Sequence, residues 1–265
     1  MANTIPELDR YFNNSSYLVT DIWENILDYA DSNVLYTNHL LNRAKEKFTS
    51  SAMSGMGGIP EHWYPVYANP SNWYDIVQDE SALIKMELDL QNGKTDTGSF
   101  IVIDEGTPLT WKAKNRKKET ISLNIHPDTV IKKIQLNVLR VDFIRPWFDF
   151  EILNQQNWEI TGLDKCYYSN GKLALNHGIF PLLTQSILFG TKISIEGNFS
   201  KNDICAMAEH EKKGSEVSLG PFLLNAQDQK VEIDQKEGGT ILTSNIKQVV
   251  GYISRLTPIS PGLPT

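Results

Sequence analysis

The pattern of apolar positions separates a helical start from a long β-rich remainder. Apolar side chains recur at helical spacing over residues 19–30, and a weaker pattern of the same kind covers 35–49. Residues 50–60 contain three glycines and mostly small side chains, which is typical of a flexible loop. We therefore expect an N-terminal helix or helical hairpin, followed by a flexible loop.

An aromatic-rich segment follows at 62–79, where a turn at Pro70–Trp73 leads into a short helix. From residue 82 onward the apolar period changes to two, as in strands that bury one face. Such patterns occupy residues 82–90, 99–104, 119–125, 130–143, 186–195, 231–233, 239–242 and 248–256. The pattern over 130–143 changes phase, which indicates a bulge. Short helices are expected at 146–154 and 202–212.

Helices that precede a run of strands are typical of the α+β class. We predict an N-terminal helix or helical hairpin packed on a mainly antiparallel β-sandwich. Residues 1–60 would form the helical segment and flexible loop. Residues 61–265 would form a β-rich body that is one continuous globular domain.

Composition places the chain among ordinary globular proteins. It has 265 residues, 40% of them hydrophobic and 22% charged, which excludes wholesale disorder. With 25 basic and 32 acidic residues, the net charge is 25 − 32 = −7. Phosphate neutralisation needs clustered Lys and Arg, and the one basic run, at 112–118, lies between two strand patterns. We expect no nucleic-acid partner.

The sequence favours a protein made in the cytoplasm. Residues 1–10 lack a basic region followed by an apolar run, so we expect no secretory signal peptide. The most apolar stretch, 173–190, contains His177 and Pro181 and is too polar for a transmembrane segment. Secretion without a cleaved signal peptide stays open. Cys166 and Cys205 are far apart in sequence and are expected to be reduced structural thiols.

No motif in the chain matches a catalytic or metal-binding signature. Glu209-His210-Glu211 has metal-ligand residue types, but neighbours on a helix point in different directions. His126 lies at a strand end, and no Gly-x-Ser-x-Gly motif accompanies it or His177. We expect no metal, no cofactor and no enzyme activity. A hydrolase that uses His126 or His177 with a nearby carboxylate stays open as the less favoured alternative.

The segment Arg140–Phe148 is the most unusual in composition, because it places Arg145, Pro146 and Trp147 directly after a long strand. One interpretation is structural, with the arginine bonding strand-end carbonyls under an aromatic lid. The other is a partner anchor, since Trp and Arg are the favoured hot-spot residues of interfaces. The candidate binding residues come from this region and from the aromatic-rich segment 62–79. They are Arg145, Trp147, Trp158, Trp63, Trp73 and Tyr74.

Several short motifs resemble a known group of proteins. They are Val141–Phe148, Asn157-Trp158, Phe180–Leu183, Ile187–Ile193, Val250–Ile253 and Pro70–Asp75. Together, over about residues 60–255, they resemble the paired accessory proteins encoded beside the Mak-type tripartite α-pore-forming toxins of Vibrio and related bacteria. The resemblance implies a non-enzymatic accessory or chaperone-like protein with no catalytic residues to transfer. It also implies toxin subunits or a paralogous accessory protein as partners.

An alternative function follows from the same aromatic residues. Exposed aromatic rings on a β-sandwich are suited to stacking against sugars or to contacting lipid. A carbohydrate- or lipid-binding β-sandwich therefore stays open beside the accessory-protein hypothesis.

Overall fold

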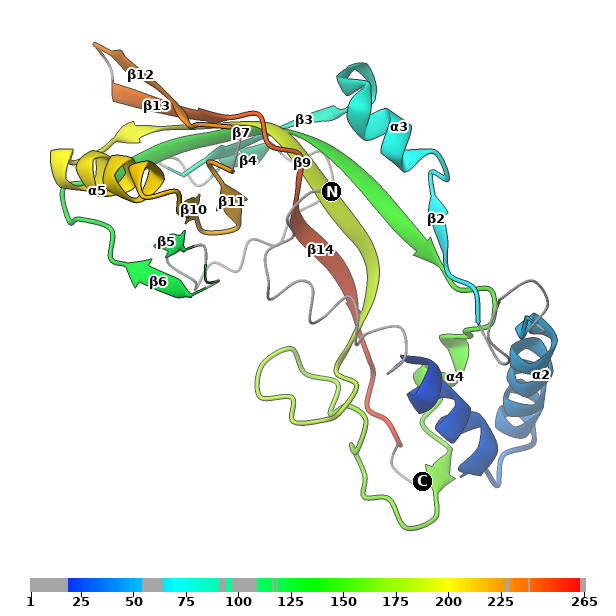
Figure 1. Ribbon diagram of the computed structural model, residues 1–265. Helices are drawn as coiled ribbons and strands as arrows, with labels where there is room; N and C mark the ends of the chain where they lie inside the picture. Colours follow the sequence, from blue (N-terminus) through cyan, green and yellow to red (C-terminus); the bar gives the residue numbers. More distant parts are fainter. Residues whose placement is uncertain are drawn as a thin grey trace. The chain divides into compact units, whose positions relative to one another are not determined.

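A computed structural model describes residues 19–53, 64–90, 94–96, 109–115, 117, 119–226, 229–237 and 239–262 (Figure 1). The chain is of the α+β class, with N-terminal helices followed by mainly antiparallel sheets, as predicted. Every strand pair whose register is described is antiparallel. The strand patterns at 84–89 and 248–256 appear as β3 (Ile84–Asp89) and β14 (Gln248–Leu256). The strand expected at 99–104 lies outside the described residues.

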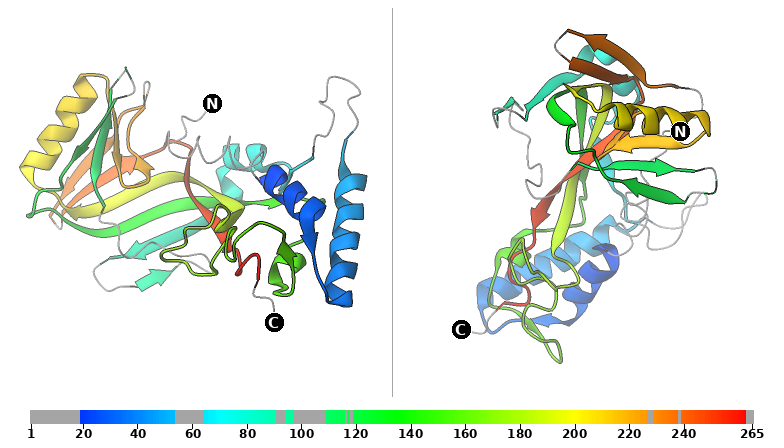
Figure 2. Two further views of the ribbon diagram at one scale, coloured as in Figure 1. Left: turned by 90° about the horizontal axis from the view of Figure 1, so that it is seen from below. Right: turned by 90° about the vertical axis from the view of Figure 1, so that its left-hand side faces the viewer.

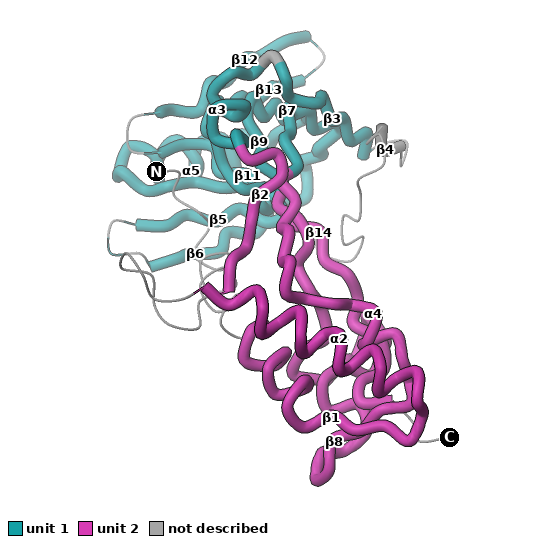
Figure 3. Tube along the Cα trace, turned by 90° about the vertical axis from the view of Figure 1, so that its right-hand side faces the viewer, with its two compact units in different colours: residues 1–5, 72–140, 188–251 teal, residues 6–71, 141–187, 252–265 magenta. Residues whose placement is uncertain are grey.

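The chain forms two compact units, each assembled from separate stretches of sequence (Figure 3). Unit 1 comprises residues 1–5, 72–140 and 188–251, and unit 2 comprises 6–71, 141–187 and 252–265. The division expected from the sequence, with a helical segment and loop over 1–60 and one globular β-rich body over 61–265, stays a prediction. Of the expected loop at 50–60, the first two residues complete helix α2 (Leu35–Ser51), and 54–60 lie outside the described residues.

Unit 1 is a sandwich of two sheets. The larger sheet has the order β12-β13-β9-β7-β3-β4, and the smaller has the order β11-β10-β5-β6 (Figures 1 and 2). Besides β3, the strands of these two sheets are β4 (Lys94–Asp96), β5 (Trp111–Lys114), β6 (Thr120–Leu123), β7 (Val130–Ile144), β9 (Leu182–Asn198), β10 (Glu216–Leu219), β11 (Phe222–Leu223), β12 (Glu232–Lys236) and β13 (Gly239–Ser244). Both sheets contribute buried side chains to one core, including Ile134, Ile195, Trp111 and Leu219.

Two helices of unit 1 bear on the candidate sites. Helix α5 (Lys201–Lys212) adds Met207 to the core, and its first turn is capped by the Ser200 hydroxyl, which accepts a hydrogen bond from the Asp203 N–H at 3.1 Å. Helix α3 (Trp73–Gln78) follows the turn at Pro70, as the sequence predicted, and precedes the 3₁₀ turn η2 (Glu80–Ala82).

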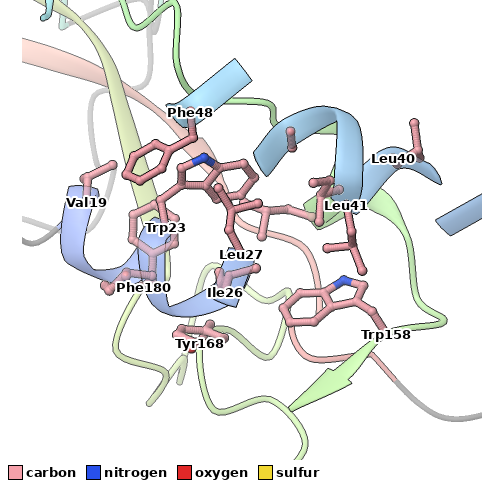
Figure 4. Close-up of a cluster of buried hydrophobic side chains, with 14 of the residues drawn as sticks. Val19, Trp23, Ile26, Leu27, Leu40, Leu41, Phe48, Trp158, Tyr168 and Phe180 are labelled. Atoms are coloured by element: carbon pink, nitrogen blue, oxygen red, sulfur yellow. The ribbon is translucent and has the colours of Figure 1, made fainter. Parts of the chain in front are cut away.

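Unit 2 is organised around an aromatic core. The helix over 19–29 and helix α2 turn their apolar faces inward, so the predicted helical hairpin is present (Figure 4). They pack with Trp147 and with Ile152 and Leu153 of α4 (Glu151–Asn154). The short strands of this unit are β1 (Ala30–Asp31), β2 (Tyr67–Asn69) and β8 (Glu159–Ile160). β1 pairs with β8, and β2 pairs with the last residues of β7.

The phase change predicted within β7 falls at the border between the two units. Ile134, Leu136 and Val138 are buried at every second position, and the next buried residue is Val141, three positions on. Residue 140 is the last of its stretch in unit 1, and Val141 is the first of the next stretch in unit 2. The apolar period therefore restarts where the strand passes from one compact unit to the other.

Candidate binding sites

Trp147 is a core residue of unit 2. Its side chain is 1% exposed, and its indole N–H donates a hydrogen bond to the Pro65 carbonyl at 2.9 Å. Its own carbonyl accepts a hydrogen bond from the Trp23 indole at 3.2 Å. The rings of Phe48 and Tyr64 approach it edge-on, with centroid distances of 6.0 and 5.8 Å. The ring thus has no surface left to offer a partner.

Arg145 ties the end of β7 to the adjoining β9. Its guanidinium donates to the Thr184 carbonyl at 2.9 Å and lies 5.4 Å from the centre of the Phe143 ring. Burial lowers the pKa of the Arg145 guanidinium to about 10, because a charged group in a poorly hydrated site loses solvation. This resembles the structural interpretation considered from the sequence, with an arginine that bonds a strand carbonyl beside one aromatic ring.

Trp158 belongs to the same core as Trp147. It is 2% exposed, and its ring lies 6.3 Å from that of Tyr168 (Figure 4). Its indole N–H has no hydrogen-bond acceptor among the described residues. The structure therefore brings two of the candidate binding residues together, but as packed interior. Their proposed role in partner binding stays a prediction, and their burial gives it no support.

Trp73 and Tyr74 remain at the surface of unit 1, on the first turn of α3, whereas Trp63 lies outside the described residues. The Trp73 ring stacks on Phe189 of β9, with centroids 4.8 Å apart and planes inclined by 12°. Tyr74 meets Trp73 edge-on at 5.9 Å and is 62% exposed. We call Trp73, Tyr74 and Phe189 the aromatic platform.

Polar contacts fix α3 and η2 beside the aromatic platform. Lys247 donates to the Gln78 side-chain oxygen at 2.6 Å at the end of α3. Lys192 of β9 forms an ion pair with Glu80 of η2. The sequence alone identified Trp73 and Tyr74 as candidate residues. The stacking of Trp73 on Phe189 depends on β9, which lies more than 100 residues further along the chain. Tyr74 is therefore an exposed aromatic ring on a short helix that polar contacts hold in place, with the charged side chains of Lys247, Lys192 and Glu80 on the same elements or in contact with them.

A cavity of about 240 Å³ lies in unit 1 between α5 and the smaller sheet. Apolar side chains of Trp111, Met207 and Val217 line it, together with the imidazoles of His126 and His210. The Trp111 indole N–H is buried without a hydrogen-bond acceptor among the described residues. The volume is smaller than that of most ligand pockets, which begin at about 300 Å³.

The buried carboxylate of Asp203 holds the backbone of His126, and the exposed carboxylate of Asp128 lies 3.5 Å from its imidazole Nδ1. The backbone N–H of His126 donates to both carboxylate oxygens of Asp203, at 3.3 and 3.2 Å. The hydroxyl of Thr129 donates to the same carboxylate. The imidazole Nδ1 instead accepts from the Asp128 N–H at 3.3 Å, and the Asp128 side chain is 82% exposed. No buried carboxylate among the described residues orients this ring for base catalysis.

Metal ligands and thiols offer no further site within the described part of the chain. No group of three His, Cys, Asp or Glu side chains there is arranged to hold a metal ion. Cys166 and Cys205 are both free thiols. No helix in the described ranges is long and apolar enough to cross a membrane.

No family model, curated protein sequence or solved structure matches the chain.

Proposed function

We propose that this chain is a non-enzymatic binding protein that serves as an accessory to the subunits of a bacterial toxin. The nature of the partner comes from the resemblance of the Val141–Phe148 motif and its companion motifs to the accessory proteins of Mak-type toxin loci. A paralogous accessory protein is the second partner class that the resemblance implies.

The aromatic platform is the observation that carries this proposal. Tyrosine and tryptophan are enriched at the energetic centres of protein interfaces, because a rigid ring buries a large area at a small cost in entropy. The Tyr74 ring is 62% exposed, and Trp73 is held in place by stacking on Phe189. A partner that covers Tyr74 would therefore meet a preformed surface.

The experiment is an affinity pull-down with the tagged full chain from a lysate of its source organism, read by mass spectrometry. We expect the unaltered chain to recover subunits of a pore-forming toxin, and Tyr74→Ala to recover at least about tenfold less, as for a hot-spot residue. Tyr29→Ala is the matched control, because Tyr29 is 65% exposed and lies in unit 2. Equal recovery by Tyr74→Ala would refute the platform, and absence of toxin subunits would refute the partner.

A carbohydrate ligand is the second candidate for the same platform. The parallel stack of Trp73 on Phe189, with Tyr74 at its edge, resembles the flat aromatic surfaces on which sugar rings stack. A glycan array with the unaltered chain and Tyr74→Ala separates the two candidates. Glycan binding that is lost in Tyr74→Ala, without recovery of toxin subunits, would replace the protein-partner proposal.

A further inference from the structure

The long connection between β8 and β9 in unit 2 is firmly anchored at its base. Tyr168 is 1% exposed, and its hydroxyl donates to the Asn25 side chain at 2.7 Å. The backbone of Tyr168 and Ser169 pairs with Ser260, with N–H donors 2.8–3.2 Å from carbonyl acceptors. A Cβ atom at Gly178 would collide with the Tyr168 backbone, so the two limbs of the connection approach closely. We call residues 165–181 the apolar loop.

Two asparagines hold the tip of the apolar loop in one conformation. Asn170 donates to the Leu175 carbonyl at 2.8 Å and accepts from the Lys172 N–H at 2.9 Å. Asn176 donates to the Lys172 carbonyl at 3.0 Å and accepts from the Gly178 N–H at 3.2 Å. These side-chain amides thus satisfy backbone groups of residues 172, 175 and 178 within the loop itself.

The side chains at this tip are leucines. Leu173 is 75% exposed and Leu175 is 80% exposed. Leu175 also has a φ of 58°, a left-handed conformation that glycine and asparagine adopt far more readily than leucine. A large apolar side chain that is both strained and mostly exposed contributes little to the stability of the fold. Such a residue indicates a role in binding something other than the chain itself.

Further exposed apolar side chains belong to the same part of unit 2. Tyr167, Ile179 and Leu182 are 41–46% exposed. From the sequence, residues 173–190 were recognised only as a stretch too polar to cross a membrane. The exposure of Leu173 and Leu175 at the tip of a loop was not predicted.

The apolar loop is also free of acidic side chains. No Asp or Glu occurs between Asp164 and Glu196, although the whole chain carries 32 of them and a net charge of −7. The segment 252–262, which hydrogen-bonds to the base of the loop, contains none either. Lys165 and Lys172 are both exposed. The surface thus combines aliphatic side chains, a tyrosine and two exposed lysines, with Asp164 beside Lys165 as the one acidic residue next to the loop in sequence.

We propose that the apolar loop docks this protein on an anionic lipid bilayer. Leu173 and Leu175 would insert among the acyl chains, Tyr167 would lie at the headgroup level, and Lys165 and Lys172 would contact lipid phosphates. This combination of aliphatic and aromatic insertion with lysines at the rim is how interfacial segments bind membranes. The geometry favours a bilayer over a protein, because the leucines project from a tip and need no matching groove in the partner.

The test is co-sedimentation of the full chain with vesicles of phosphatidylcholine, with and without phosphatidylglycerol. We expect binding to the mixed vesicles that weakens with added salt. The variant Leu173→Ser/Leu175→Asn should lower the partition coefficient about tenfold or more, since each leucine loses its transfer into the acyl region. Asparagine tolerates the left-handed backbone at 175, so this variant is expected to fold.

Matched variants separate docking from general stickiness. Leu35→Ser removes a leucine that is 86% exposed on α2 and should leave vesicle binding unchanged. Lys165→Gln/Lys172→Gln should lower binding to the mixed vesicles and reduce its salt dependence. Absence of vesicle binding by the unaltered chain would overturn the proposal. So would an equal loss in Leu35→Ser, or a loop variant that binds vesicles normally but no longer recovers a protein partner.

Discussion

Replacing Trp147 with alanine tests whether the Arg-Pro-Trp corner is part of the core or a surface for a partner. The side chain is 1% exposed, so the substitution removes nearly the full buried area of a tryptophan. An aromatic side chain buries about 150–250 Å², and at about 25 cal/mol per Å² this corresponds to about 4–6 kcal/mol. Measured Trp→Ala substitutions in cores cost about 3–5 kcal/mol.

The indole hydrogen bond of Trp147 adds to this cost. Truncation leaves the Pro65 carbonyl without its indole donor, which costs about 1 kcal/mol or more in a buried site. We therefore expect Trp147→Ala to lower the free energy of unfolding by about 4–5 kcal/mol, a large part of the total for an ordinary domain. Trp147→Phe keeps a buried ring and should cost about half as much, so it remains measurable if the alanine variant does not fold.

Urea unfolding followed by circular dichroism measures both variants, with Tyr74→Ala as the control. Tyr74 is 62% exposed, so its truncation should cost less than about 1 kcal/mol. If Trp147→Ala were as stable as Tyr74→Ala, the ring could not be packed as described. A stable Trp147→Ala chain that had lost its partner would identify the corner as a binding anchor.

Three further substitutions have defined outcomes. Leu175→Asn should raise the free energy of unfolding by about 0.5–1 kcal/mol by relieving the left-handed leucine, and an unchanged or lower urea midpoint would argue against strain at this position. Burial, and to a lesser extent the neighbouring Tyr167, raises the pKa of Tyr168 to about 12. Because the unfolded chain then loses this proton first, near pH 10, stability should fall by about 2 kcal/mol between pH 10 and 12. Tyr168→Phe should flatten this alkaline decline in a pH series of urea melts, whereas an equally steep decline would exclude Tyr168 as its source. Ser200→Ala removes the cap of α5 and should cost about 1 kcal/mol in thermal or urea unfolding, with no change if the hydroxyl contact is unimportant.

Local patterns were sufficient to predict the elements whose side chains follow one period. The helical spacing over 19–30 corresponds to the helix at 19–29, and the alternation over 248–256 corresponds to β14. Shorter elements, such as β10 (Glu216–Leu219) and β2 (Tyr67–Asn69), were not predicted. Three or four residues carry too little periodicity, and these strands form because a partner strand supplies their hydrogen bonds.

The candidate site residues show where sequence reasoning reaches its limit. Trp147 and Trp73 are both tryptophans beside other aromatic residues, and the sequence treats them alike. In the structure the first is enclosed by the helices of unit 2, and the second stacks on Phe189 beside the exposed Tyr74. The difference arises from contacts with segments far away in sequence.

By itself, the sequence determined the α+β class, the order of the longer helices and strands, the acidic net charge and the acid-free stretch after Asp164. These are properties of composition and of local period, which each segment carries with it. Only the tertiary structure decided which aromatic rings are interior and that Leu173 and Leu175 face outward. Burial depends on what the rest of the chain places against a side chain, and that is settled by long-range packing.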